Sequence, residues 1–258
     1  MLREAAAVQY ARAAVPAAIN GIRIVFPDVR VSLGLRITSR SRRLTGQDLQ
    51  TALDNSEKRD FALEMAMTAL EALMRADVTS DRFTLFGKLY RSVRRWEVLL
   101  AERHGTPILS SGQRRQLARL LREGSTVRNE SRAVLVHGDL QPAHVIVNEA
   151  ERWLAFVDLE MLHVSKPVMN FVQLWGGFHF ADPLLGRELF RRYAARFPEA
   201  VDGQFDVDAR TEIALRCYSQ VRDGQRLHNP VMMERALALM STVLSTESLD
   251  GLFTGEDA

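Results

Sequence analysis

Residues 134–160 read VLVHGDLQPAHVIVNEAERWLAFVDLE, a segment in which short apolar runs alternate with isolated charged residues. The runs VLV, VIV and WLAFV have the length and composition of short strands. Asp139 follows the first run, His144 comes directly before the second, and Asp158 closes the third. Two turns between such strands would bring the three side chains to one end of a small sheet.

These three side chains suit a site for a metal ion and a nucleotide. Phosphoryl transfer needs a carboxylate that orients or deprotonates the acceptor hydroxyl, and oxygen ligands that hold magnesium against the phosphates. In protein kinases the catalytic-loop aspartate and a metal-binding asparagine are five residues apart, and a further aspartate comes from a later strand end. Asp139 and His144 have this spacing, and Asp158 lies 19 residues after Asp139.

The motif HGDLQPAH followed by FVDLE resembles the catalytic segment of the aminoglycoside phosphotransferase and choline kinase superfamily, which reads H-G-D-x-x-x-x-N and then I-D-x-D/E. The resemblance implies that Asp139 is the catalytic base and that Asp158 is the principal metal ligand. It also implies Glu160 as a second acid of the metal site and a structural role for His137 in the loop. The cofactors implied are ATP and Mg²⁺, and the implied acceptor is a hydroxyl of a small molecule or sugar.

One position departs from the superfamily pattern, because His144 stands where the metal-binding asparagine is expected. Lipopolysaccharide core sugar kinases, which share the fold, can carry a histidine at the matching position. The resemblance therefore implies His144 as a metal ligand. Because imidazole suits softer metals than Mg²⁺, Mn²⁺ is an alternative cofactor.

The expected fold is α+β and protein-kinase-like, with a truncated small lobe and a mostly helical large lobe. Residues 1–44 would be the remnant of the small lobe: a helix at 2–14, strands at 22–26 and 29–37, and a hinge at 40–44. Residues 45–258 would be the large lobe, with the catalytic loop at 137–144 and the metal motif at 157–160. On this alignment Glu4 and Arg40 fall on the nucleotide-binding side, Glu4 as the acid that pairs with a phosphate-binding lysine and Arg40 in the hinge against the adenine.

Two parts of a kinase small lobe are missing from the sequence. No GxGxxG motif occurs, and no lysine precedes Lys58. A remnant of two strands would expose an edge, through which the hairpin at 22–37 is expected to self-associate. Alternatively, Met1 is not the biological start of the protein.

Composition excludes several classes of protein. The 34 basic and 32 acidic residues nearly balance, so the sequence does not predict a nucleic-acid-binding surface. No apolar run reaches the roughly 18 residues of a membrane helix. A cytoplasmic location is the default, and Cys217, the single cysteine, is expected in the core.

Two interpretations of the function stay open at this point. The first is an ATP-dependent phosphotransferase, which the two aspartates favour. The second is a weak or inactive kinase-fold protein that acts as a binding or regulatory module, which the missing lysine and Gly-rich segment favour. Asp139 and Asp158 would then be ordinary loop acids, and His144 a polar residue at a strand end.

Two features of the segment after the motif bear on the same site. Residues 175–180, WGGFHF, either line an acceptor pocket or, as is more usual for aromatic residues on a helix, belong to the core. Asn170 stands where many members of the superfamily have an aspartate that braces the catalytic loop, and it keeps the capacity for hydrogen bonding without the charge.

Overall fold

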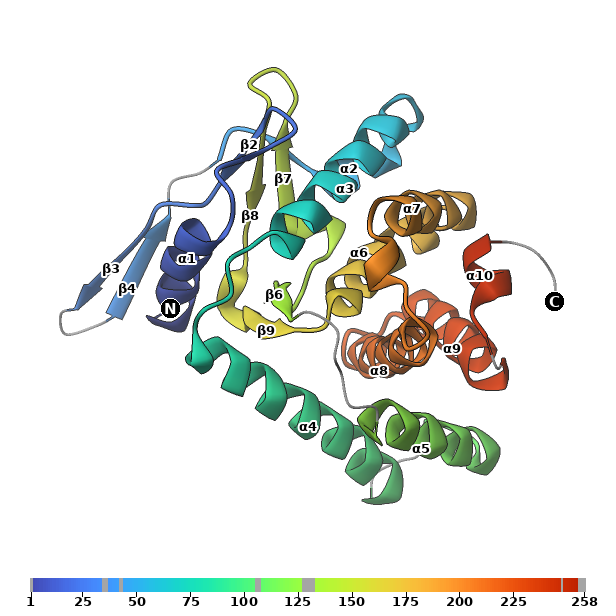
Figure 1. The fold of residues 1–258 in the computed structure, drawn as a ribbon. Helices are drawn as coiled ribbons and strands as arrows, with labels where there is room; N and C mark the ends of the chain where they lie inside the picture. Colours follow the sequence, from blue (N-terminus) through green and yellow to red (C-terminus); the bar gives the residue numbers. More distant parts are fainter. Residues whose placement is uncertain are drawn as a thin grey trace. The chain divides into compact units, whose positions relative to one another are not determined.

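The computed structural model describes residues 2–33, 37–41, 44–104, 108–126, 133–246 and 248–254. The chain divides into two compact units: residues 1–86 with 132–193, and residues 87–131 with 194–258. All strands in the described part of the chain belong to the first unit (Figure 1). The expected α+β class is therefore confirmed.

The first unit begins with helix α1 (Leu2–Ala14), whose bounds match the expected helix. Its first turn carries Glu4 and its last turn Arg12, the charges that complement the helix dipole at each end. Ala7, Val8 and Ala11 form its buried side. The expectation of a short helix over residues 2–14 is met.

A five-stranded sheet forms the centre of the first unit, in the order β1-β2-β8-β7-β5. The strands are β1 (Ala18–Ile19), β2 (Ile22–Val25), β5 (Gln47–Asp48), β7 (Val145–Asn148) and β8 (Trp153–Phe156). Strand β2 runs parallel to β8, whereas the other pairs are antiparallel. All four residues of β8 are buried, because the strand lies between β2 and β7 and both of its faces are covered.

The pairing expected for the first strands is wrong. The strand at residues 22–25 does not pair with the segment after Pro27, because it lies between β1 and β8. The segment expected as one strand at 29–37 instead contains a reversal: β3 (Val29–Leu33) pairs with β4 (Ile37–Ser41), and Leu33 lies opposite Ile37. A reversal at this register preserves an alternation of period two, so the alternation could not reveal it.

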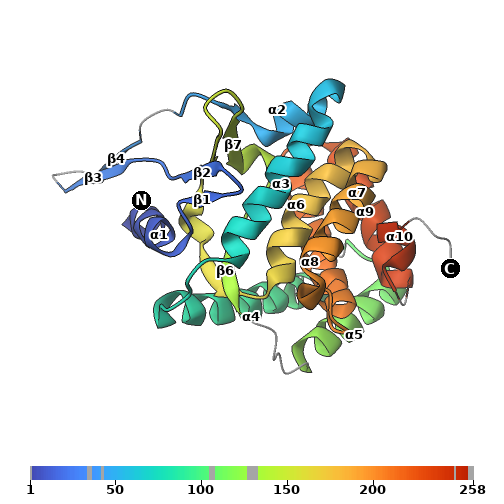
Figure 2. The same cartoon turned by 45° about the horizontal axis from the view of Figure 1, so that its top comes forward.

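This correction changes where an exposed edge would lie. Strand β2 is internal to the sheet, while β3 and β4 form a separate two-stranded sheet among the described residues (Figures 1 and 2). Self-association stays a prediction, and its expected location moves to the β3–β4 hairpin. The boundary expected between residues 44 and 45 lies inside the first unit, and the assignment of residues 1–44 as a small lobe likewise stays a prediction.

Besides α1, four helices of the described chain lie wholly or mainly in the first unit. They are α2 (Leu49–Asp54), α3 (Arg59–Met74), α6 (Pro167–Ala181) and α7 (Pro183–Arg196), with short 3₁₀ turns η1 (Ser56–Lys58), η2 (Pro142–His144) and η3 (Leu159–Met161). Helices α2 and α3 contact the central sheet. Asp48 caps α2 by accepting a hydrogen bond from the Thr51 amide at 2.8 Å. Helices α3 and α6 lie side by side and both contact β6 (Val134–Val136), which pairs with β9 (His163–Ser165) (Figure 2). Helix α6 is almost wholly buried, which makes it a rigid support for the loop that follows β6.

The second unit is helical throughout its described residues. It contains α5 (Ser111–Thr126), η4 (Pro198–Ala200), α8 (Phe205–Arg226), α9 (Pro230–Ser245) and α10 (Asp250–Thr254), while α4 (Asp81–His104) runs across the division between the units. Cys217 is 1 % exposed, as expected for a core residue, and burial raises the pKa of its thiol to about 12. Among the helices described, none combines the length and the apolar character that a membrane crossing needs.

Candidate active site

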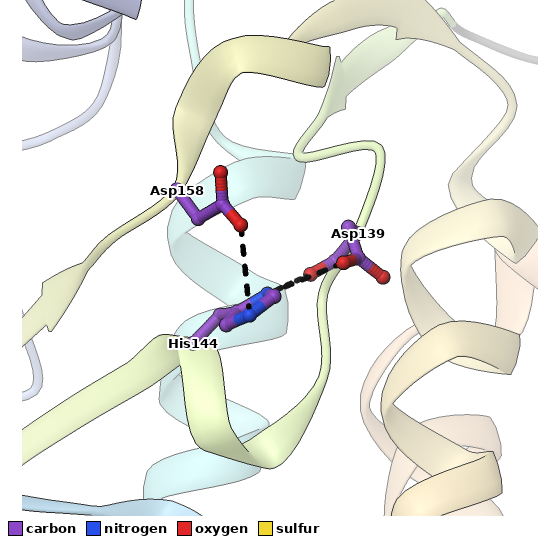
Figure 3. A group of neighbouring side chains, drawn as sticks. All are labelled: Asp139, His144 and Asp158. Carbon is purple, nitrogen blue, oxygen red and sulfur yellow. Dashed lines mark hydrogen bonds and ion pairs between the residues drawn. The ribbon is translucent and has the colours of Figure 1, made fainter. Parts of the chain in front are cut away.

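Asp139, His144 and Asp158 converge at the ends of three different elements (Figure 3). The Nδ1 atom of His144 lies 3.5 Å from Oδ2 of Asp139, and its Nε2 atom lies 3.7 Å from Oδ2 of Asp158. One ligand atom from each residue lies within 4.8 Å of the other two. The structure therefore brings together the three side chains that the sequence singles out, while their roles stay predictions.

The β7–β8 hairpin places two of these residues. Val145 pairs with Phe156, and the Val157 amide donates to the His144 carbonyl at 3.1 Å, so His144 and Asp158 face each other at the open end of the hairpin. Asp139 arrives from β6, which belongs to a separate two-stranded sheet. The three residues thus meet where the ends of two separate sheets come together. The sequence had predicted that all three strands belong to one small sheet.

The hydrogen bonding of His144 fixes which ring nitrogen is free. Its Nδ1 atom lies 2.7 Å from the backbone carbonyl oxygen of Asp139. A carbonyl oxygen can only accept, so Nδ1 carries a proton and donates it. In the neutral ring, Nε2 then presents its lone pair on the side of Asp158, which is the form of imidazole that binds a metal ion.

The Asp139 carboxylate contacts Gln141 through one oxygen and His144 through the other. Its Oδ1 atom accepts a hydrogen bond from the Gln141 side chain at 2.8 Å. The side chain of Asp139 is 36 % exposed, which leaves it accessible to an acceptor molecule. Gln141 was missed from the sequence because the motif treats its position as variable; a polar side chain two residues after the aspartate was the available signal.

His137 joins the two loops of the site. The ring is fully buried; Nδ1 accepts from the Asp139 amide at 3.3 Å, so Nε2 carries the proton and donates to the Val157 carbonyl at 2.9 Å. Burial, with a smaller contribution from the nearby His144, lowers the pKa of His137 to about 4. These contacts support the structural role that the resemblance implied.

The neutrality of His137 predicts acid sensitivity of the metal-free protein. Its pKa is about 4 in the fold against 6.5 when unperturbed, so between these values the unfolded chain binds a proton that the folded chain does not. The contribution of His137 to the free energy of unfolding is therefore fully present above pH 6.5. It is lost as the pH falls toward 4, by about 3 kcal/mol in total. Urea unfolding in EDTA at several pH values across this range measures the slope, that is, the change in the free energy of unfolding with pH.

A matched pair of variants separates this effect from general acid unfolding. His137→Gln removes the titrating group and should flatten the slope. His228 is exposed and its φ of 52° is one that asparagine tolerates, so His228→Asn should leave the slope as in the unaltered protein. Equal slopes in all three proteins would contradict the assignment.

Two side chains of α6 hold the backbone on both sides of the loop. Asn170 accepts from the His137 amide at 3.1 Å and donates to the Leu135 carbonyl at 2.8 Å. One turn later, Gln173 accepts from the Leu140 amide at 2.8 Å and donates to the Gly138 carbonyl at 2.9 Å. Asn170 keeps the bracing contact that was expected of it. Gln173 was missed, although its position three residues after Asn170 places it on the same helix face.

Gly138 is required by both conformation and space. Its φ is +91°, and a Cβ atom there would lie 2.3 Å from the backbone oxygen of Met161.

The backbone of Asp158 is also unusual, since it has left-handed angles (φ 59°, ψ 54°). Non-glycine residues in this region carry strain and cluster at functional sites. Neither conformation was evident from the sequence.

Gly138→Ala is therefore expected to lower the free energy of unfolding by about 3 kcal/mol, from left-handed strain and from the displacement of Met161. Gly203→Ala is the matched control, because no heavy atom lies within 4 Å of a Cβ at that position. Denaturant unfolding of both variants measures the difference. Similar stabilities of the two would show that the contact between the loop and Met161 is not tight.

The other predicted site residues lie outside this cluster. The ligand atoms that lie within 4.8 Å of one another do not include those of Glu160, which is exposed. Glu4 is half-buried on α1 and has no ion pair among the described residues. Arg40 lies in β4, and its side chain is outside the described part of the structure. Their roles stay predictions.

The aromatic segment of α6 belongs mainly to the core. Trp175 and Phe178 are fully buried, and His179 stacks on Trp175 with ring centres 4.6 Å apart. A Cβ atom at Gly177 would lie 2.4 Å from Pro142, so α6 packs directly against η2 at this point. The segment thus packs against the loop that carries Asp139 and His144. Of its two interpretations, the structure favours the one that placed these aromatic residues in the core.

Comparison with known proteins gives one family match. The family model described as "Phosphotransferase enzyme family" matches residues 2–203. Among curated protein sequences, none matches the chain.

Several solved structures have a similar fold. A structure of the aminoglycoside phosphotransferase APH(4)-Ia is 15% identical, with a TM-score of 0.61 over 93% of this chain and 82% of that one. A thermostable mutant of the same enzyme, in a ternary complex with ADP and hygromycin B, is 14% identical, with a TM-score of 0.59 over 94% and 81%. The GDP and kanamycin complex of APH(2")-IIia is 15% identical, with a TM-score of 0.57 over 93% and 83%. Aminoglycoside phosphotransferases have a protein-kinase-like fold, so the expected fold is confirmed.

Proposed function

The chain belongs to the phosphotransferase enzyme family, and we therefore propose that it transfers the terminal phosphoryl group of ATP to a hydroxyl of a small polar molecule or sugar. The observation that carries the proposal is the convergence of Asp139, His144 and Asp158. A partly exposed carboxylate beside a pair of side chains with metal-ligand atoms is the arrangement that phosphoryl transfer needs.

Asp139 has the position of the base in this proposal. Its amide donates to His137, Gln173 holds the backbone of the two neighbouring residues, and Gln141 donates to its Oδ1 atom, so the carboxylate has a fixed direction. It orients the acceptor hydroxyl and takes its proton as the acceptor oxygen bonds to the γ-phosphorus of ATP, while the bond from that phosphorus to the bridging oxygen breaks and ADP leaves. Fixing this geometry before the acceptor binds lowers the entropic cost of the reaction.

His144 and Asp158 are the residues that would hold a divalent cation. The donor set fits, because it offers a carboxylate oxygen, an imidazole Nε2 whose tautomer is already set, and the neighbouring Asp139 carboxylate. A bound cation would neutralise charge on the phosphates. Since imidazole suits Mn²⁺ better than Mg²⁺, we propose that Mn²⁺ supports the reaction at least as well as Mg²⁺.

The class of acceptor is proposed from the similar structures. Two of the similar structures contain hygromycin B or kanamycin. At 14–15% identity these structures show the shared fold, and acceptor specificity is set by side chains that vary within one fold. We propose a polyhydroxylated small molecule, with aminoglycosides and sugars as the first candidates.

Glu4 and Arg40 keep their proposed places on the nucleotide side, and Glu160 its place as a second acid. The 258-residue sequence contains no GxGxxG motif and no lysine before Lys58. The same observation favours the second candidate, a kinase-fold protein that binds nucleotide without efficient transfer.

Mass spectrometry of acceptor mixtures tests the proposal. The protein is incubated with ATP, Mg²⁺ or Mn²⁺, and a panel of aminoglycosides and sugars, and products that gain one phosphoryl group are sought. A product that requires both the protein and the metal supports the enzyme. Metal-dependent ATP binding without any phosphorylated product, or hydrolysis of ATP without transfer to any acceptor, would favour the second candidate, a kinase-fold protein without efficient transfer.

A further inference from the structure

Arg3, at the start of α1, contacts the segment that follows Asp158. Its Nε atom donates to the Glu160 carbonyl, and its Nη2 atom lies 3.5 Å from the Leu162 carbonyl. The guanidinium also lies over the Phe86 ring, 3.4 Å from the ring centre. Such a planar cation can donate in its plane and stack through its face at the same time.

The segment that Arg3 contacts has few hydrogen bonds of its own. Turn η3 is three residues long, and a turn of this length leaves most of its carbonyls without partners. The Leu159 carbonyl accepts from the Leu162 amide at 3.0 Å, and the Met161 carbonyl accepts from His163 Nδ1 at 2.7 Å. The remaining two carbonyls, of Glu160 and Leu162, face Arg3. Arg3 therefore links α1 to a carbonyl inside the turn and to the carbonyl of the residue that follows it.

Turn η3 contacts both chain segments that carry the carboxylates of the candidate site. It begins directly after Asp158, whose left-handed backbone must be held by its surroundings. Its last residue, Met161, packs so closely on Gly138 that no Cβ fits between them. A shift of η3 would therefore move Asp158 and the loop that carries Asp139 relative to each other.

We propose that Arg3 is a positioning residue, which sets Asp158 relative to Asp139 by holding η3 against α1. The metal-binding part of this inference rests on the proposed function, whereas the effect on η3 does not. Arg3 touches neither carboxylate, so its effect is transmitted through the backbone carbonyls of the turn. Outer contacts of this kind typically change metal affinity by about 10- to 100-fold when they are removed.

Three variants test the role. Arg3→Met keeps an apolar stem against Phe86 and removes the donors, and Arg3→Lys keeps the charge without the planar fork. Arg12→Met is the matched control: Arg12 lies on the same helix and also donates to a carbonyl, that of Pro27 at 3.1 Å, but does not contact η3. Amide hydrogen exchange at residues 159–163, melting temperature, and calorimetric Mn²⁺ affinity in the presence of ATP are measured for each.

The expected result is specific to Arg3. Arg3→Met should speed exchange at residues 159–163 and weaken Mn²⁺ affinity by about 10-fold or more, with a melting temperature near that of Arg12→Met. Arg3→Lys should recover part of the affinity. Arg12→Met should change neither exchange in η3 nor affinity.

Two other outcomes would overturn the inference. If exchange in η3 is unchanged in Arg3→Met, Arg3 does not hold the turn. If exchange rises while Mn²⁺ affinity stays the same, the contact serves stability alone. Absence of Mn²⁺ binding in the unaltered protein would instead count against the proposed function, and exchange would still decide whether Arg3 holds η3.

Discussion

Asp139→Asn is expected to lower phosphoryl transfer by about 10²- to 10⁴-fold, the usual contribution of a general base. The amide keeps the shape of the side chain, and its oxygen can still accept from Gln141, so the loop should keep its conformation. The side chain is 36 % exposed and contributes little packing, so the melting temperature should stay within a few degrees. Initial rates of product formation, measured with the acceptor found by mass spectrometry, give the result.

Asp202→Asn provides the matched control. Asp202 is also a loop aspartate whose Oδ1 atom accepts a hydrogen bond from the residue two positions later, the Gln204 amide at 2.9 Å. It belongs to the second unit, whereas Asp139, His144 and Asp158 belong to the first. Its variant should keep full activity. Equal turnover in Asp139→Asn and Asp202→Asn would remove Asp139 from the role of base.

Asp158→Ala should abolish the metal-dependent part of ATP binding. The carboxylate is the only hard anionic ligand that faces Nε2 of His144 in the group of three, so its loss leaves imidazole and the Asp139 carboxylate alone. ATP affinity measured by calorimetry should then be the same with Mg²⁺, with Mn²⁺ and with EDTA.

A second variant separates charge from backbone strain at this position. Alanine tolerates the left-handed φ of 59° poorly, whereas asparagine tolerates it well. Asp158→Asn should therefore keep the melting temperature and still lose most of the metal dependence. A metal-dependent gain in ATP affinity that survives in both variants would show that Asp158 is not a ligand.

The parts of the site that the sequence predicted are close together in the chain. Asp139, His144 and Asp158 lie within 20 residues, and the two short strands between them form a hairpin whose register follows from local pairing. A spacing motif captures such an arrangement, because few backbone paths connect the residues. The convergence of these three side chains and the helical character of the remainder could therefore be predicted from the sequence.

The parts that the sequence did not predict depend on contacts between distant segments. Arg3 meets Glu160 and Leu162 only once α1 has packed against η3. Gln173 reaches the loop only once α6 has packed beneath it. Strand β2 was paired wrongly for the same reason, since its partner β8 lies some 130 residues later in the chain. Local periodicity cannot identify such partners.

Pulsed electron paramagnetic resonance of Mn²⁺ bound with a non-hydrolysable ATP analogue tests the central claim most directly, because it identifies the atoms next to the metal without any need for turnover. The account predicts a phosphorus coupling from the nucleotide together with a nitrogen coupling from His144. In His144→Asn the nitrogen coupling should disappear while the phosphorus coupling remains, and in Asp158→Ala the nitrogen coupling should be lost as well, because the cation then stays with the nucleotide alone. Bound Mn²⁺ that shows neither coupling, or the same spectrum in all three proteins, would contradict the assignment of Asp139, His144 and Asp158 as a metal–nucleotide site.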